Sequence, residues 1–155
     1  MADDRTAAGG CRCDDCAIRR TLARYNIAGD RGDLTGLAAT FTEDGVLHAP
    51  GIHVTGRAAI VARLQQSMAG HNPALTRVQH NLTTSLIEVD GEGSARCRSY
   101  FVVFTDIGPD HAGSYHDRLA RVGGEWLIAE RSAKLSWLSP DSLFTVASDD
   151  PAAGP

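Results

Sequence analysis

The sequence predicts an α+β domain in which a strongly curved, mixed or antiparallel sheet packs against three N-terminal helices as a cone-shaped barrel. Three observations lead to this prediction. Apolar residues recur at helical spacing in three segments before residue 70, four long segments after residue 76 are rich in β-branched and aromatic residues, and turn residues separate these four. Helices and strands segregated along a chain are typical of an α+β fold. A bent sheet backed by helices encloses a cone, which side chains fill or a ligand occupies.

The first helix is expected from about Asp15 to Gly29, with Leu22 and Tyr25 on its apolar face. Asp30 follows at the end of this face. A carboxylate in the last turn of a helix opposes the helix dipole, and burial raises its pKa, as a general base requires. The alternative is that Asp30 only forms an Asx turn with the backbone near Gly32.

Two more helices and a small hairpin follow. Asp33 is placed to cap a second helix from Leu34 to about Thr40. Residues 46–48 and 53–54 form the hairpin. A third helix begins at Thr55 or Gly56 and ends at Gly70, and four of its apolar residues are spaced for burial on one side: Ala59, Ile60, Leu64 and Met68.

Four long strands complete the domain. The last two form a hairpin across Gly123 and Gly124, a pair that suits a two-residue turn. The expected strands are residues 76–89, 94–105, 113–122 and 125–138.

The turn length predicts the register of this last hairpin. A two-residue turn places His116 opposite Arg131 and Asp117 opposite Glu130. Because Trp126 is expected to face inward, this register puts Arg131 outside the cone unless a bulge shifts the strand. If Arg131 is buried instead, its plain role is to pair with Asp117.

Length and charge limit the partners. The 155 residues suit one domain, which we place at residues 14–138, between a loose arm at residues 1–13 and a mobile tail at residues 139–155. Leu143 and Phe144 in that tail could fold over an apolar surface. The net charge of −4 gives no reason to expect nucleic acid or membrane as a partner. No signal peptide or membrane-spanning run is evident, so we expect a cytoplasmic protein.

The cysteines raise the question of a metal. Cys11, Cys13 and Cys16 could supply three thiolates, but no fourth ligand lies nearby in the sequence. The interpretation we favour is an oxidisable arm in which Asp14 or Asp15 caps the first helix. Histidine spacing typical of a transition-metal centre and Gly-rich phosphate loops are both missing from the sequence. We therefore predict neither metal nor cofactor.

Several short motifs occur along the predicted elements: Tyr25-x-x-x-x-Asp30-x-x-Asp33, Phe41-x-x-Asp44-Gly45-Val46, Gly56-Arg57-x-x-Ile60, His80, Tyr115-x-Asp117 and Trp126-x-Ile128-x-x-Arg131. These motifs and the order of elements resemble the nuclear-transport-factor-2-like, or SnoaL-like, superfamily over roughly residues 14–138. This resemblance implies the cone fold but no single activity, because the superfamily includes dehydratases, ketosteroid isomerase, limonene epoxide hydrolase, polyketide cyclases and non-catalytic members.

The chain is most similar to the branch that contains scytalone dehydratase, bile-acid dehydratase and lindane dehydrochlorinase. That branch uses an Asp at the end of the first helix and a His on the first long strand, which match Asp30 and His80. A Tyr earlier on the helix, as in the bile-acid dehydratases, matches Tyr25. The resemblance therefore implies these three residues as the catalytic set.

The chemistry of these residue types agrees with that assignment. His80, with an ordinary pKa of about 6.5, is a natural base at neutral pH, and Asp30 would fix its tautomer by bonding the other ring nitrogen. Tyr25 could donate a hydrogen bond to a carbonyl or leaving oxygen. The alternatives are that His80 is a partly exposed strand residue bonded to Asn81 and that Tyr25 is core packing.

The other histidines receive no catalytic role. His48 and His53 are expected at the rim of the cone, and His71 and His111 in loops.

These residues lead to three hypotheses. The first is a cofactor-independent lyase or isomerase of dehydratase type that acts on a small apolar cyclic metabolite, such as a polyketide or terpenoid intermediate. The second is a non-catalytic ligand-binding or dimerisation module, and the third is a cyclase or epoxide hydrolase in the same cavity. We expect substrate to be lined by Phe101, Asp117, Trp126 and Arg131.

Two structural features bear on these hypotheses. Contact between Asp30 and His80 in an open pocket favours an enzyme, whereas a cone filled by Phe101, Phe104 and Trp126 favours the non-catalytic module. An open sheet face that carries Phe104 and Trp137 predicts a homodimer or homotrimer.

Overall fold

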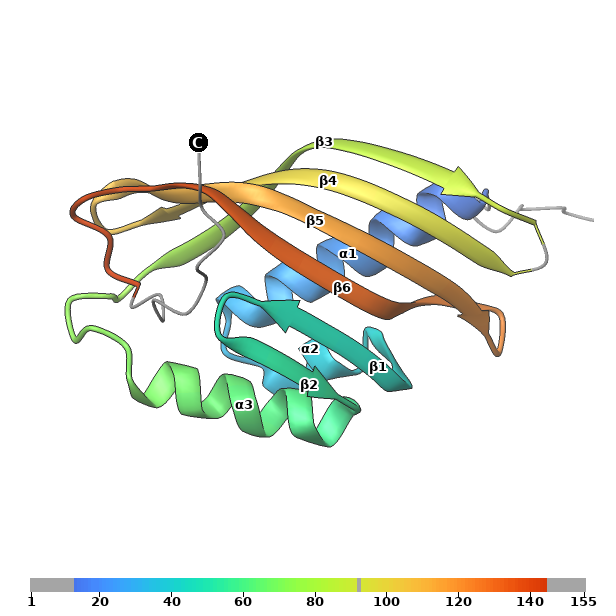
Figure 1. Ribbon diagram of the computed structural model, residues 1–155, viewed down its shortest axis with the longest axis horizontal. Helices are drawn as coiled ribbons and strands as arrows, with labels where there is room; N and C mark the ends of the chain where they lie inside the picture. The colour runs from blue at the N-terminus through green and yellow to red at the C-terminus, as the bar shows by residue number, and fades with distance from the viewer. Residues whose placement is uncertain (1–12, 92, 145–155) are drawn as a thin grey trace, which may run out of the picture.

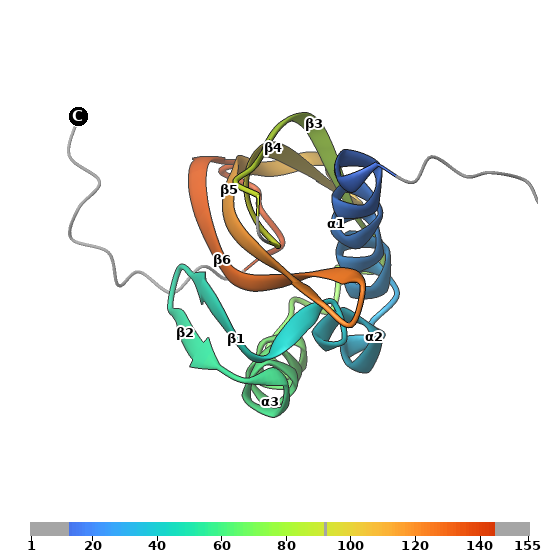
Figure 2. The same ribbon diagram turned by 90° about the vertical axis from the view of Figure 1, so that its right-hand side faces the viewer.

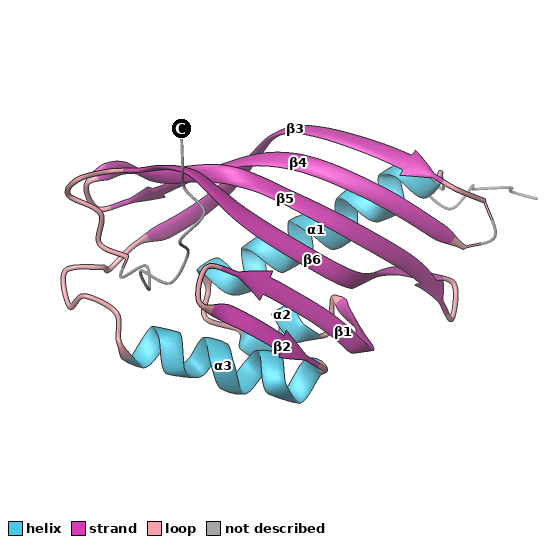
Figure 3. Ribbon diagram, in the orientation of Figure 1, coloured by secondary structure: helices cyan, strands magenta, loops and turns pink. Residues whose placement is uncertain are grey.

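The computed structural model describes residues 13–91 and 93–144 (Figure 1). Within these residues the elements are α1 (Asp14–Asp30), α2 (Leu34–Ala38), β1 (Phe41–Ala49), β2 (Ile52–Thr55), α3 (Arg57–Ala69), β3 (Val78–Val89), β4 (Ser94–Thr105), β5 (Gly108–Val122) and β6 (Glu125–Leu138). The expected α+β class is confirmed, with helices and strands in separate layers (Figure 3). Most of the expected arm, residues 1–12, and residues 145–155 of the expected tail lie outside the described residues.

All of these strands join one mixed sheet in the order β2-β1-β6-β5-β4-β3. Neighbouring strands are antiparallel except β1 and β6, which are parallel. The twist of long antiparallel strands curls the sheet around α1, which lies against its concave side (Figure 2). Strands β2 and β3 are the two edges and do not pair with each other. The expected cone is therefore present as an open, curved sheet and not as a closed barrel.

The helix ends follow local capping chemistry. Asp33 caps α2 as expected, since its Oδ1 accepts a hydrogen bond from Gly36 N–H at 2.8 Å. The expected cap of α1 is wrong: Cys13 takes this place, and its Sγ accepts from Cys16 N–H at 3.3 Å. Asp14 instead accepts from the indole of Trp126 at 3.0 Å.

Two groups of buried side chains fill the space between helices and sheet. In α3, Ile60 is fully buried as expected, whereas Met68 is 43% exposed, so the prediction that it is buried is wrong. The larger core lies under α1 and includes Ile18, Leu22, Phe41, Ile60, Trp126 and Ile128. The smaller core is formed by Phe101, Val103 and Tyr115, with Leu82 and Phe144 packed against it.

The last hairpin has the expected turn but not the expected register. Val122 pairs with Glu125 across the two-residue turn, and Leu119 still pairs with Ile128. Between Leu119 and Arg118 the register shifts by one residue, which is a β-bulge. The strand beyond it therefore turns its other face inward.

This bulge brings Arg131 into the interior. Arg131 pairs with Asp117, and not with His116 as the simple register predicts. The Arg131 side chain is 0% exposed. The prediction that Arg131 lies outside the cone is therefore wrong, because the bulge supplies the shift that the turn length alone does not.

Candidate active site

The C-terminus of α1 meets the edge strand β3 at Asp30 and His80. Asp30 Oδ1 lies 2.6 Å from His80 Nδ1, and the two carboxylate oxygens also accept the His80 backbone N–H at 3.2 and 3.0 Å. As β3 is an edge strand, this N–H has no neighbouring strand to bond. The carboxylate of Asp30 thus holds β3 and not the turn at Gly32.

The same contacts determine which nitrogen of the neutral His80 ring carries the proton. An ionised Asp30 accepts a proton-bearing Nδ1, so Nε2 carries the lone pair of the neutral ring. Asn81 does not bond this ring, because its amide donates to Gln79 O at 3.1 Å. The side chains of His80 and Asp30 are 23% and 18% exposed, so both are mostly buried but remain partly accessible to water.

A second Asp–His pair lies beside the first. His111, expected in a loop, is in β5, because this strand begins at Gly108 and not at Gly113. The register between β4 and β5 shifts between Val103 and Phe104. The extra residue of this bulge is Asp110, so Asp110 and His111 are both buried although they are consecutive.

This second pair contacts the first through the two imidazole rings. His111 Nδ1 lies 2.7 Å from Asp110 Oδ1. The rings of His80 and His111 have centroids 6.4 Å apart and planes at 81°. The sequence analysis missed this pair, although an Asp directly before a His was a usable signal, because Gly108 and Pro109 resemble a turn.

Burial and hydrogen bonding set the charges of the second pair. Burial lowers the pKa of His111, and Asp110 only partly offsets this. Burial alone would raise the pKa of Asp110, but hydrogen bonds from Ser142, His111 and Leu143 hold it below its usual range. At neutral pH the pair is therefore a neutral imidazole beside a carboxylate, and His111 Nε2 is a hydrogen-bond acceptor.

We expect His111 to make folding stability depend on pH. Its folded pKa is lowered from the ordinary 6.5, so the unfolded chain binds this proton first as the pH falls. The stability is fully present above pH 6.5 and declines below it, by at most about 1.4 kcal/mol per pH unit for one proton. His111→Asn keeps an N–H for Asp110 but cannot titrate, so urea unfolding between pH 6.5 and 5 should show a shallower decline. Equal slopes for the two proteins would contradict this assignment.

A buried aromatic cluster adjoins the histidines. The guanidinium of Arg131 contacts the rings of both Tyr25 and Tyr115, 4.1 Å from each centroid, and these two rings meet edge to face at 6.2 Å. Phe101 stacks on Tyr115 at 4.5 Å, and its centroid is 6.1 Å from that of His111. A continuous series of ring contacts therefore joins Tyr25 to the two histidines.

The charged groups of this cluster satisfy each other. Arg131 Nε and Nη2 each donate to Asp117 at 2.8 Å, and both side chains are fully buried. Burial would lower the pKa of Arg131, but Asp117 keeps it raised. Burial raises the pKa of Tyr25 and Tyr115, so both phenols stay protonated and can donate hydrogen bonds. Only Nη1 of this guanidinium is buried without a partner among the described residues.

Not every expected site residue joins the cluster. Trp126 bonds Asp14 at the start of α1, whereas Asp30 lies at the end of this helix. Phe104 is 40% exposed. Of the three residues that would fill the cone in the non-catalytic alternative, only Phe101 lies beside the histidines.

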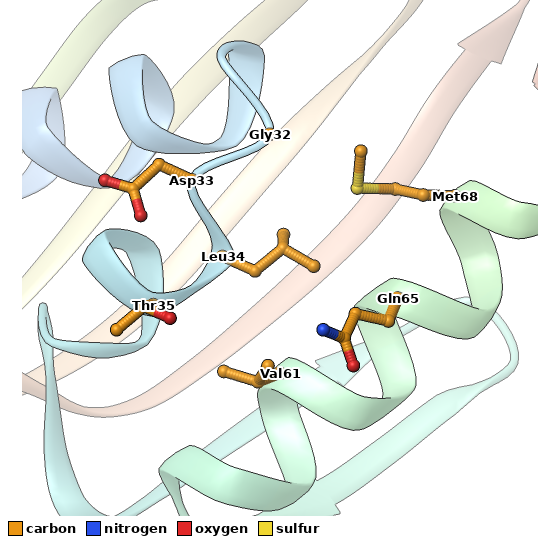
Figure 4. Close-up of a pocket in the computed structure, with 7 residues that line it drawn as sticks. All are labelled: Gly32, Asp33, Leu34, Thr35, Val61, Gln65 and Met68. Carbon is orange, nitrogen blue, oxygen red and sulfur yellow. The ribbon is translucent and has the colours of Figure 1, made fainter.

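Two hollows open near these elements. One, of about 400 Å³, lies between α1 and β3 and is lined by Arg19, Asn26, Ile27, His80 and Ser85 among others. The other, of about 360 Å³, lies between α2 and α3 (Figure 4) and is lined by Gly32, Asp33, Leu34, Thr35, Val61, Gln65 and Met68. The only carboxylate of the second hollow, Asp33, caps α2. The hollow that touches a catalytic candidate is thus the first.

The described residues contain neither a metal-binding cluster nor a membrane-spanning helix. Within residues 13–91 and 93–144, no cluster of three or more His, Cys, Asp or Glu side chains is arranged to hold a metal ion. Cys11 of the N-terminal cysteine group lies outside the described residues. None of the described helices is both long and apolar enough to cross a bilayer.

Comparison with known proteins agrees with this fold. Residues 12–132 match the family model of the SnoaL-like domain. The chain belongs to this SnoaL-like family. The resemblance seen in the motifs is thereby confirmed at the level of the family. No curated protein sequence matches this SnoaL-like chain significantly.

Solved structures with the same fold come from several bacteria. A protein of unknown function from Mycobacterium tuberculosis is 32% identical, with 89% of this chain and 80% of that chain covered and a TM-score of 0.70. A protein from Catenulispora acidiphila in complex with S-DNPA is 28% identical, with 78% and 92% covered and a TM-score of 0.69. A "Putative Scytalone Dehydratase" from Novosphingobium aromaticivorans is 23% identical, with 90% and 93% covered and a TM-score of 0.73, and shows likeness of fold alone.

Proposed function

We propose that this SnoaL-like protein is a cofactor-independent lyase or isomerase of dehydratase type, acting on a small apolar cyclic metabolite. The observation that carries the proposal is the Asp30–His80 contact. Nδ1 of His80 is held at 2.6 Å by a carboxylate, and no hydrogen bond within the described residues uses its Nε2. A ring held in this way is oriented as a general base.

The proposed reaction uses this geometry. His80 Nε2 takes a proton from a carbon that is acidified by an adjacent carbonyl, and Asp30 stabilises the imidazolium that forms. The electron pair of the broken C–H bond forms the new double bond, and the C–O bond to the leaving hydroxyl breaks. The imidazolium returns its proton to the departing oxygen, so that water leaves and His80 is again neutral.

His111 gives the substrate a second point of attachment. Its ring is 6.4 Å from that of His80, close enough for one small molecule to contact both. Since His111 is neutral and its Nδ1 is used by Asp110, its Nε2 accepts a hydrogen bond from a substrate hydroxyl. A hydroxylated ring satisfies both histidines, whereas a plain hydrocarbon does not.

In this proposal the aromatic cluster forms the apolar wall of the site beside the histidines, although none of its rings lines the hollow that His80 touches. Phe101 contributes the ring beside His111, and the phenols of Tyr25 and Tyr115 donate to a carbonyl or leaving oxygen. Asp117 and Arg131, expected to contact substrate, instead hold these tyrosines in place in this proposal. Trp126 packs at the other end of α1, so this proposal gives it no contact with substrate.

Two relatives support a small-molecule site in this fold. The Catenulispora acidiphila protein holds S-DNPA, and the Novosphingobium aromaticivorans protein carries a dehydratase name. The expected homodimer or homotrimer stays a prediction; Tyr100, Phe104 and Trp137 are the exposed aromatic residues of the sheet that would support it.

The test is turnover of cyclic β-hydroxy ketones and hydroxylated aromatic precursors in D₂O. We expect the wild-type protein to exchange the carbon-bound proton and to release water. NMR detects the exchange, and mass spectrometry detects the loss of water. His80→Ala should lower the rate by about two to four orders of magnitude. His53→Ala, a change at an exposed histidine of β2, is the matched control and should keep the rate. Full activity in His80→Ala would refute the mechanism, and binding without turnover in the wild type would identify a binding module instead.

A further inference from the structure

The chain after β6 folds back over the second Asp–His pair, although the sequence predicts a mobile tail there. Ser139 N–H donates to the carbonyl oxygen of Asp110 at 2.8 Å. Ser142 Oγ donates to Asp110 Oδ1 at 2.7 Å, and Leu143 N–H donates to Asp110 Oδ2 at 2.9 Å. We call residues 139–144 the C-terminal strap. The strap is thus bonded to the sheet at Asp110, while the mobility of the tail stays a prediction.

The last described residue of the strap covers the histidine. The ring of Phe144 lies 4.8 Å from His111 and 5.4 Å from His71, centroid to centroid. Phe144 also packs against the core cluster that contains Phe101 and Tyr115. The strap returns at the end of the sheet where β4 turns into β5 and β3 begins (Figure 1). It therefore closes the same end of the cone at which the two histidines lie.

The carboxylate of Asp110 links the strap to His111. Oδ1 accepts from both Ser142 and His111 Nδ1, while Oδ2 accepts from Leu143 and from Thr105 Oγ1 at 3.2 Å. A buried carboxylate needs such partners, and a purely structural strap would only provide them. However, Ser142 and His111 both bond the same oxygen of Asp110, Oδ1. The position of Ser142 therefore sets the rotation of the carboxylate, and the carboxylate in turn sets the plane of the imidazole.

We propose that the C-terminal strap is a working part of the site, in which Ser142 is a positioning residue that aligns Asp110 with His111 and Phe144 shields the histidine from water. This inference rests on the proposed function for its catalytic meaning. The alignment itself can be tested without any substrate, because the His111 ring reports on it directly.

The test uses imidazole NMR of the full-length ¹⁵N-labelled protein. Ser142→Ala should speed the exchange of the His111 Nδ1 proton with water, and Phe144→Ala should raise the pKa of His111 toward its ordinary value because burial is reduced. Ser142→Thr keeps the hydroxyl and should restore slow exchange. Ser136→Ala is the matched control, because Ser136 also bonds β5, through Ala112 O at 3.2 Å, but does not touch Asp110. The other titratable groups near His111 are His80, whose ring faces it, and Asp30, the partner of His80, and all of these variants keep both.

The outcomes separate the two proposals. If the protein eliminates water as proposed, Ser142→Ala should lower kcat by roughly ten- to a hundredfold with little change in KM, and Ser142→Thr should recover it. If the wild type shows no elimination, the proposed function fails, while the NMR comparison still decides the role of the strap. Identical His111 exchange and titration in Ser142→Ala, Phe144→Ala and Ser136→Ala, each folded by circular dichroism, would overturn the strap proposal.

Discussion

Asp30→Asn is expected to lower kcat by about two to four orders of magnitude while the protein stays folded. The Asp30 carboxylate accepts two hydrogen bonds, from Nδ1 and from the backbone N–H of His80. An amide has one oxygen, and the backbone N–H can only donate, so this oxygen turns to the backbone. The amide N–H₂ then faces Nδ1 of the ring.

This change reverses the tautomer of His80. An N–H₂ group that faces Nδ1 requires a lone pair there, so the proton of the neutral ring moves to Nε2. Nε2 is the atom that must accept the substrate proton, and it then has no lone pair to do so. The loss should therefore be in kcat, and the ¹⁵N shifts of the His80 ring should show the exchanged tautomer.

A neighbouring residue provides the matched control for this variant. Asp33→Asn makes the same change three residues later, at the residue that caps α2. Asn is as good a helix cap as Asp. This control should keep both activity and stability. Wild-type turnover by Asp30→Asn, or an unchanged His80 tautomer, would show that Asp30 has a structural role only.

The sequence was informative at several places where structure depends on near neighbours, although not at the cap of α1. The cap at Asp33, the turn at Gly123 and Gly124 and the bounds of β4 and β6 agree with expectation because turn chemistry and side-chain periodicity act over a few residues. The contact between Asp30 and His80 was foreseen through resemblance and the order of elements. Nothing local to either residue requires it, since they lie 50 residues apart.

The errors at Arg131 and at His111 share one cause, which is the β-bulge. A bulge depends on how facing strands pack and leaves no periodic signal in its own strand. One bulge turned Arg131 inward, and another put Asp110 and His111 on the same face. The sequence indicated that Leu143 and Phe144 could fold over an apolar surface. It did not indicate that Ser142 and Leu143 bond Asp110, because this carboxylate lies far earlier in the chain.

Breaking the Asp117–Arg131 pair is expected to be the most destabilising change, because it leaves an uncompensated charge in the core. Asp117→Leu removes the carboxylate that accepts two hydrogen bonds from a guanidinium with 0% exposure. Loss of one partner of a buried pair costs about 3–5 kcal/mol of unfolding free energy. Tyr25 and Tyr115, whose rings both contact that guanidinium, should lose their fixed positions as well.

The double variant Asp117→Leu with Arg131→Met tests whether charge or shape is responsible. Replacing both ions by apolar groups of similar volume is often neutral or stabilising, so the double variant should regain most of the unfolding free energy that Asp117→Leu loses. Urea unfolding of the wild type, both single variants and the double variant gives the coupling energy. A double variant as unstable as Asp117→Leu would mean that the pair stabilises the core through its hydrogen bonds. Recovered stability with lost turnover would instead assign Arg131 to the positioning of Tyr25 and Tyr115, because the fold would persist without the ion that both rings contact.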